Sequence, residues 1–132
     1  FTRQHDPDFI DGNTISVFDN NNIALKKFKP QSRVLVMAVA EDRVETWYQG
    51  TTEAPFFTDV MGAHDWVSPD TALLTDSSNG RVLVVNSAGE TLWEYFNATG
   101  PDTVGIVPNA IEVPDGLYGL YQQSQSERCS VN

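Results

Sequence analysis

The sequence is poor in cysteine, in basic residues and in long apolar runs, and each scarcity excludes a class of protein. A single cysteine, Cys129, rules out an internal disulfide framework. No run of about 18 apolar residues exists to span a bilayer, and residues 1–10 lack the layout of a signal peptide. Eight basic against 18 acidic residues give a net charge of −10, which disfavours nucleic acid as a partner.

Metal and phosphate sites are not expected either. Two histidines, one cysteine and scattered carboxylates offer no ligand spacing of the zinc or calcium type. A glycine-rich phosphate loop is absent from the sequence. The chain begins at Phe1 and soon enters patterned sequence, which indicates that further sequence precedes it.

The apolar residues that are present alternate with a period of two, which predicts β-strands. Turn signals rich in Gly, Asn, Asp and Ser separate the expected strands, which cover residues 14–18, 33–39, 44–48, 72–75, 81–85 and 90–96. Residues 22–28 have a composition that suits a helix, but Pro30 follows closely, so we predict a loop. After Asn97 the pattern weakens: 106–113 is a candidate strand interrupted by Pro108, 116–121 a strand weakened by glycines, and 122–132 a frayed polar end.

An internal repeat organises these strands. His5-Asp6, Arg33-Val34-Leu35-Val36 and Trp47 recur in the same order as His64-Asp65, Arg81-Val82-Leu83-Val84 and Trp93. Asn20 to Gln31 hold an insertion of about ten residues that is confined to the first copy. Each copy is a meander typical of a β-propeller blade.

We therefore predict an all-β fold, an incomplete β-propeller of two to three antiparallel four-stranded blades. It forms one domain over residues 1–132, with blade-like repeats at about 5–50 and 64–97 and weaker strands and a tail over 98–132. Because closed propellers need at least about four blades, this chain cannot close a ring by itself.

The order and spacing of the repeat resemble the arylsulfotransferase family. In the first copy the resemblance rests on Phe1, Gln4-His5-Asp6, Asp11-Gly12-Asn13 and Val17-Phe18-Asp19-Asn20. In the second it rests on Phe57, Gly62, His64, Leu73-Leu74-Thr75, Gly80-Arg81-Val82, Val85, Gly89-Glu90 and Trp93-Glu94-Tyr95. The family usually continues Gln-His with Thr, where this chain has Asp6, and Asn21-Asn22 stand where the family has a glycine.

The resemblance implies a six-bladed, periplasmic or secreted enzyme. Such an enzyme moves a sulfuryl group from an aryl sulfate ester to a phenol through a sulfohistidine, without a nucleotide sulfate cofactor. His5 matches the histidine of the family's Gln-His step, which makes it the expected catalytic residue. An imidazole suits this role because a neutral ring nitrogen attacks sulfur and then leaves readily. The expected substrate-binding residues are Arg3, Gln4, Asp6, Asn20 and His64.

Each of these residues also has a structural interpretation. His5 is a candidate for a loop hydrogen bond at a blade edge, and His64 stands at the same place in the second copy, as a blade-capping residue would. Asp6 either orients the His5 ring or caps a turn with Pro7. Asn20 suits a turn formed through its side chain.

The remaining repeat positions favour packing over chemistry. Trp47 and Trp93 close equivalent strands and suit packing between blades, with a stacking platform for an aromatic ligand as the alternative. Arg33 and Arg81 open equivalent strands, either as architecture or to bind sulfate.

These interpretations leave three hypotheses for the function. The first is the sulfotransferase. The second is a non-catalytic propeller that binds a ligand or a protein on its loop face. The third is a small β-sandwich, or a homo-oligomer that hides its open strand edges.

Overall fold

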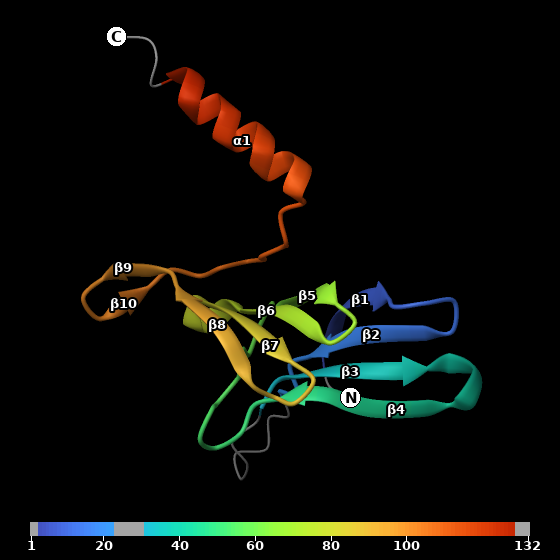
Figure 1. Cartoon of the computed structure of the whole chain (residues 1–132). Helices are drawn as coiled ribbons and strands as arrows, with labels where there is room; N and C mark the ends of the chain where they lie inside the picture. Colours follow the sequence, from blue (N-terminus) through green and yellow to red (C-terminus); the bar gives the residue numbers. More distant parts are fainter. Residues whose placement is uncertain (1–2, 23–30, 129–132) are drawn as a thin grey trace.

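A computed structural model of the chain describes residues 3–22 and 31–128, without the side chains of 125–128. These residues form two four-stranded sheets, a two-stranded hairpin and one α-helix (Figure 1). The first sheet holds β1 (Gln4–Phe9), β2 (Thr14–Asp19), β3 (Arg33–Ala38) and β4 (Arg43–Gln49). The second holds β5 (Ala63–Ser68), β6 (Thr71–Asp76), β7 (Arg81–Asn86) and β8 (Thr91–Phe96). The hairpin pairs β9 (Ala98–Gly100) with β10 (Thr103–Val104), and α1 spans Asp115–Arg128.

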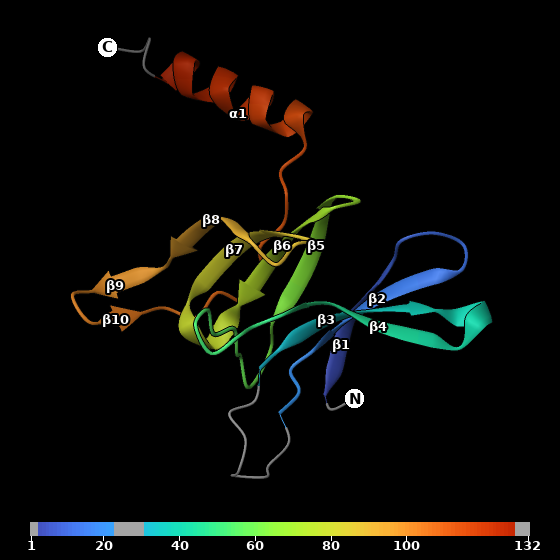
Figure 2. The ribbon, with the colours of Figure 1, turned by 60° about the horizontal axis from the view of Figure 1, so that its bottom comes forward.

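Both sheets are antiparallel meanders whose strands lie side by side in chain order. This is the strand order of a propeller blade. Figure 2 shows the two blades fanning out from a shared region at β1 and β5. The all-β fold and the incomplete propeller are thereby confirmed for the described residues.

The hydrophobic core lies between the two blades. Phe18 of β2, Tyr48 of β4 and Leu74 of β6 are buried there around Phe56, which belongs to the segment that links the blades. The ring centroids of Phe18 and Tyr48 lie 5.8 and 5.6 Å from that of Phe56, in edge contacts. Burying each such side chain contributes about 1.5–3 kcal/mol, so the blades form one packed unit.

The two repeat tryptophans have different surroundings. Trp47 makes an edge contact with Trp66 of β5 at 4.7 Å between centroids, which confirms its packing role between blades. Trp93 instead stacks on Tyr95 of its own strand and is 52% exposed. On the second blade, residues 107 and 110–112 of the following segment, rather than another blade, line the hollow beside Trp93.

The first strand of each blade was not predicted. The sequence Gln4–Phe9 carries charges and Pro7, which argue against a central strand. The structure accommodates Pro7 in a bulge of β1, at the edge of its sheet, where its missing N–H costs no ladder hydrogen bond. β5 resembles β1 in its place, because each is the edge strand nearest the other blade.

The C-terminal segment differs from the prediction. Residues 106–113 form no strand, and 115–128 form helix α1 in place of a glycine-weakened strand. Pro114 precedes the helix and accepts hydrogen bonds from the backbone N–H of Leu117 and Tyr118, while Asp115 places an acid in the first turn. Figure 1 shows α1 projecting away from the blades. No helix in the described ranges is both long and apolar enough to cross a membrane.

Other expectations fall on residues that the structure does not describe. These are Phe1, Cys129 and most of the insertion expected between Asn20 and Gln31.

Candidate functional site

The candidate site is built on a bulge in β1. His5 pairs with Phe18 and Asp8 pairs with Ser16, so two residues of β1 stand opposite one residue of β2. Asp6, the first of the two, has a left-handed backbone with a φ of 53°. Consecutive side chains of a regular strand face opposite sides. Here the bulge lets both His5 and Asp6 reach the second blade.

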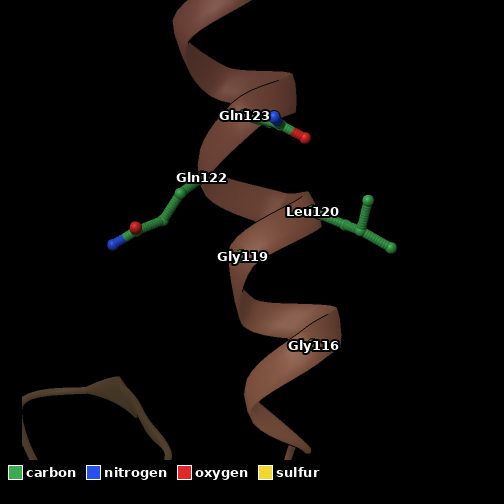
Figure 3. Close-up of a pocket in the computed structure, with 5 residues that line it drawn as sticks. All are labelled: Gly116, Gly119, Leu120, Gln122 and Gln123. Atoms are coloured by element: carbon green, nitrogen blue, oxygen red, sulfur yellow. The ribbon is translucent and has the colours of Figure 1, made fainter.

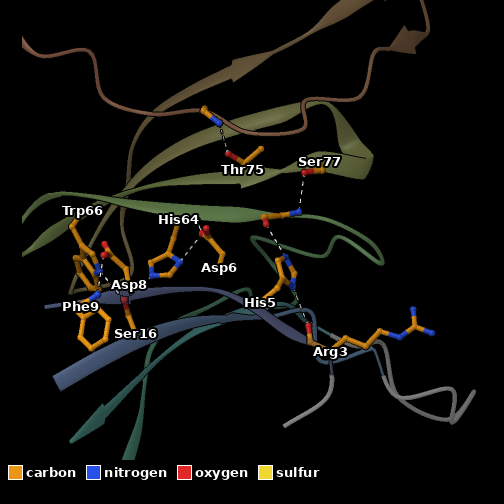
Figure 4. Close-up of polar contacts among 12 residues, drawn as sticks. Arg3, His5, Asp6, Asp8, Phe9, Ser16, His64, Trp66, Thr75 and Ser77 are labelled. Carbon is orange, nitrogen blue, oxygen red and sulfur yellow. Dashed lines mark hydrogen bonds and ion pairs between the residues drawn. The ribbon is translucent and has the colours of Figure 1, made fainter. Parts of the chain in front are cut away.

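His5 contacts the second blade through the carbonyl of Gly62. The Nε2 atom of His5 lies 2.7 Å from Gly62 O, and Nδ1 lies 3.1 Å from Arg3 O (Figure 4). The ring also contacts Phe18, at 5.3 Å between centroids. Because a neutral imidazole carries one N–H, it can donate to only one of these two carbonyls.

Because Gly62 has no side chain, it can pack closely against its neighbours. Its φ is +94°, and a Cβ there would lie 2.6 Å from Cε1 of Phe18 and 2.8 Å from Cγ2 of Thr58. Its backbone N–H donates to Oγ of Ser77 at 2.9 Å. The close approach to Phe18 and the bond to Ser77 together aim the Gly62 carbonyl at His5.

Asp6 contacts His64, the other histidine of the chain. The backbone N–H of His64 donates to Oδ2 of Asp6 at 2.6 Å, and Nδ1 of its ring lies 3.1 Å from the same oxygen. Burial of Asp6 raises the pKa of its carboxyl, but the hydrogen bonds from His64 outweigh burial and lower the pKa below its usual value. Asp6 is therefore a carboxylate that bridges the two blades.

The other side of the His64 ring contacts polar groups in the core. Its Nε2 atom lies 2.7 Å from Oγ of Ser16, which also accepts a hydrogen bond from Nε1 of Trp66 at 2.9 Å. The side chain of His64 has no exposed surface. A chain of polar contacts thus runs from Trp66 through Ser16 and His64 to Asp6.

His64 does not occupy the same place as His5. His5 pairs with Phe18, the residue before the last in β2, whereas His64 pairs with Leu74, one residue further from the end of β6. A step of one residue reverses the face of a strand. The predicted equivalence of the two histidines is therefore wrong by one position, and their rings point in different directions.

The remaining predicted residues lie around this cluster. Arg3 and Gln4 are exposed at the start of β1, and the Arg3 side chain extends away from His5 (Figure 4). Asn20 is buried, and both protons of its amide are used by the carbonyls of Thr58 and Met61, at 2.8 and 2.9 Å. The structure thus brings His5, Asp6 and His64 together and commits Asn20 to the link between blades.

Residues 1–98 match the family model described as arylsulfotransferase (ASST). This match covers three quarters of the chain and both blades. The chain belongs to the arylsulfotransferase family. Searches of curated proteins and of solved structures found no match.

The two blades of this chain differ in the partners of an equivalent buried aspartate. In the first blade Asp19 accepts two hydrogen bonds from Arg33, from Nε at 3.0 Å and from Nη2 at 2.8 Å. In the second, Arg81 turns to Glu94 and to Pro55 O, and Asp76 accepts a bond from Nδ2 of Asn79. Burial raises the pKa of Asp76 to about 6, against opposing contributions from Asn79 and Arg81. Arg33 thus binds within its blade, and Arg81 binds its own blade and the segment that links the blades, as their architectural interpretation expects.

Two cavities formed by the described residues are not lined by His5. One of about 400 Å³ lies between Trp47 and Trp66, near Asp8 and Phe9. A hollow of about 530 Å³ along α1 is left by Gly116 and Gly119, and none of its lining residues is charged (Figure 3).

Sequence reasoning did not single out Ser16 and Trp66, or predict a role for the Gly62 carbonyl. Ser16 is a small polar residue at an inward position of an apolar strand, which is a signal for a buried hydrogen bond. Nothing in the sequence indicates which carbonyl would meet His5. No cluster of three or more potential metal ligands occurs within residues 3–22 and 31–128.

Proposed function

We propose that this protein transfers a sulfuryl group from an aryl sulfate ester to a phenol, with His5 as the covalent carrier. The observation that carries the proposal is the place of His5. It is partly buried on the edge strand β1, where the two blades meet, and a carbonyl of the other blade holds its ring. Membership of the arylsulfotransferase family supports the same reaction class.

The proposed reaction has two steps. A lone pair on a ring nitrogen of His5 forms a bond to sulfur, and the bond from sulfur to the aryl oxygen breaks, releasing a phenolate. The oxygen of the acceptor phenol then bonds to sulfur as the nitrogen–sulfur bond breaks, and the phenol proton is released. Both steps need a neutral ring with its single N–H held, and the Gly62 carbonyl at 2.7 Å suits that holding role.

The other residues take supporting roles in this proposal. Arg3 is exposed and two residues from His5; its side chain extends away from the ring and would rotate toward the sulfuryl oxygens, which are good partners for a guanidinium. Gln4 precedes His5 on β1, and its exposed amide would have to turn toward the face of His5 to be a second donor for these oxygens. We further propose that the reaction takes place in the periplasm or outside the cell, which fractionation of the source cells would test.

The test measures transfer from an aryl sulfate to a second phenol. It uses a protein in which further blades complete the ring, because this chain holds two blades and a propeller closes with at least about four. We expect release of the first phenol to depend on the second, and to be lost in His5→Ala. Gln4→Ala, which leaves the ring of His5 intact, is the matched control and should weaken transfer without abolishing it. Equal transfer by the wild type and His5→Ala would contradict the proposal.

One observation favours a non-catalytic binding propeller as the second candidate. Both ring nitrogens of His5 lie against carbonyls, so one of these contacts must open before a nitrogen can attack sulfur. If both contacts are permanent, His5 is a link between β1 and the second blade. Binding of an aryl sulfate without release of phenol would support this candidate.

A further inference from the structure

We propose that His64 is a positioning residue that holds the β1 bulge through Asp6 and thereby aims His5. The inference rests on the proposed function for its catalytic meaning, but its structural content can be tested without activity. Asp6 and His5 are adjacent in β1, so whatever fixes the backbone at Asp6 also fixes the direction of the His5 ring. The contacts that fix Asp6 come from His64.

The polar contacts show which ring nitrogen of His64 carries the proton. Its Nδ1 atom lies 3.1 Å from a carboxylate oxygen of Asp6, so a lone pair on Nδ1 would face another lone pair. Nδ1 therefore carries the proton. Nε2 then accepts the hydroxyl proton of Ser16, whose oxygen is already an acceptor for the indole N–H of Trp66. The second blade thus presents a ring of fixed tautomer to Asp6.

His64 contacts Asp6 strongly through its backbone N–H and more weakly through its ring. The N–H of His64 donates to Oδ2 at 2.6 Å, whereas the contact from Nδ1 is bent and leaves that atom without a straight hydrogen bond. Both contacts converge on one oxygen. The left-handed conformation of Asp6 is unfavourable for a residue with a Cβ, and these contacts offset that cost.

The same three residues have the chemistry of an Asp-His-Ser catalytic triad, with Asp6, His64 and Ser16 in order. Burial excludes that role. Ser16 and the His64 side chain have no exposed surface, and the Ser16 oxygen is occupied by Trp66. No substrate can reach the Ser16 hydroxyl, which leaves positioning as the role of this chain of contacts.

Two isosteric variants separate positioning from packing. In His64→Asn the side-chain amide nitrogen replaces Nδ1 and can still donate to Asp6, whereas in His64→Gln it replaces Nε2 and reaches only Ser16. Because the backbone N–H of His64 still donates to Asp6, we expect the rate of sulfuryl transfer in the ring-completed protein to fall about 10-fold in His64→Gln, in kcat more than in KM. His64→Asn should retain most of the rate. Equal rates in the two variants would overturn the inference.

A measurement that does not depend on activity tests the positioning role of His64 separately from the proposed function. The His5 ring lies 5.3 Å from the Phe18 ring, so the two give nuclear Overhauser effects in NMR spectra. These signals should weaken in His64→Gln and persist in His64→Asn, even if no donor sulfonates the wild type. Unchanged signals in His64→Gln would overturn the inference, while inactive wild type with the expected signals would refute only the sulfotransferase.

Two further variants keep the inference testable if a His64 variant does not fold. Asp6→Asn keeps the left-handed backbone accessible, because asparagine tolerates it, and removes the charge that His64 contacts. It should reproduce the effect of His64→Gln on the signals between His5 and Phe18. Ser32→Ala removes an equally buried hydroxyl that lies 3.3 Å from Asn20 O and from Thr58 O and contacts neither Asp6 nor His64, so it should leave these signals unchanged.

Discussion

Replacing Asp76 with asparagine should stabilise the protein at neutral pH. Asp76 is 1% exposed and its repeat arginine, Arg81, is directed to Glu94 and Pro55 O. Burial without a full ion pair raises the pKa of its carboxyl from 3.8 to about 6. The folded protein therefore binds this proton more tightly than the unfolded chain does.

The sign of the pH dependence follows from that difference. Stability falls as the pH rises from 3.8 to about 6 and is constant above, where the ionised carboxylate is buried in the folded state. The difference between the two pKa values corresponds to about 3 kcal/mol. Asp76 borders an open pocket of about 510 Å³, whose water screens part of the cost. We expect Asp76→Asn to gain about 1–3 kcal/mol at pH 7.5 and nothing below pH ~4.

Urea denaturation at pH 7.5 and at pH 4 measures both values. The matched control is Asp19→Asn in the first blade, where the same substitution breaks the paired hydrogen bonds from Arg33. Arg33 keeps 24% of its side chain exposed, so we expect this loss at the lower end of the range for a broken buried ion pair, about 2–4 kcal/mol. An Asp76→Asn protein that is no more stable at pH 7.5, or equally stabilised at both pH values, would refute the reasoning.

Three other changes test the contacts between the blades. Gly62→Ala should lose about 2–4 kcal/mol in thermal unfolding, because its Cβ would meet the Phe18 ring and its φ is +94°; a loss under about 1 kcal/mol would contradict this. Ser16→Ala should lose about 1–3 kcal/mol, since Nε2 of His64 is left buried without a partner; an unchanged midpoint of denaturation argues against the contact. The stabilising charge of Asp6, whose pKa is lowered, is present above 3.8 and lost as the pH falls through the lowered value. The deficit of Asp6→Asn relative to the wild type should therefore shrink in acid, and a constant deficit from pH 7 to acid would be inconsistent with this.

The strands that pack on the core were the predictable part of the fold. β2, β3, β6 and β7 alternate or cluster apolar residues because one face is buried, and their predicted ranges differ from the observed ones by a residue or so. β1 and β5 are edge strands whose polar residues bind the other blade through side chains. Their sequences therefore lack the alternation that marks a half-buried strand.

The membership of the candidate site was predictable only in part, and its arrangement was not. The family pattern pointed to His5, and the polar neighbour Asp6 was among the expected residues. The bulge at Asp6 depends on a left-handed backbone at a non-glycine residue, which a sequence pattern does not reveal. That bulge puts the two His-Asp steps out of register, so the repeat in sequence suggested an equivalence that the strand pairing does not have.

The C-terminal helix shows that the apolar periodicity of a short segment does not distinguish a strand from a helix. Residues 116–121 alternate large residues with glycine and resemble a weak strand, but they pair with no strand among the residues that the structure describes. Pro114 and Asp115 supply a helix start, and the following Gln, Ser, Glu and Arg residues suit a helix once it has begun.

The most direct test of the proposed function is intact-mass spectrometry of the ring-completed protein after brief exposure to an aryl sulfate. The account predicts a mass increase of one sulfuryl group that maps by peptide analysis to His5, disappears when a phenol is added, and is absent from His5→Ala. No adduct across several aryl sulfates, or an adduct that persists in His5→Ala, would contradict the account and leave His5 as a structural link between the blades.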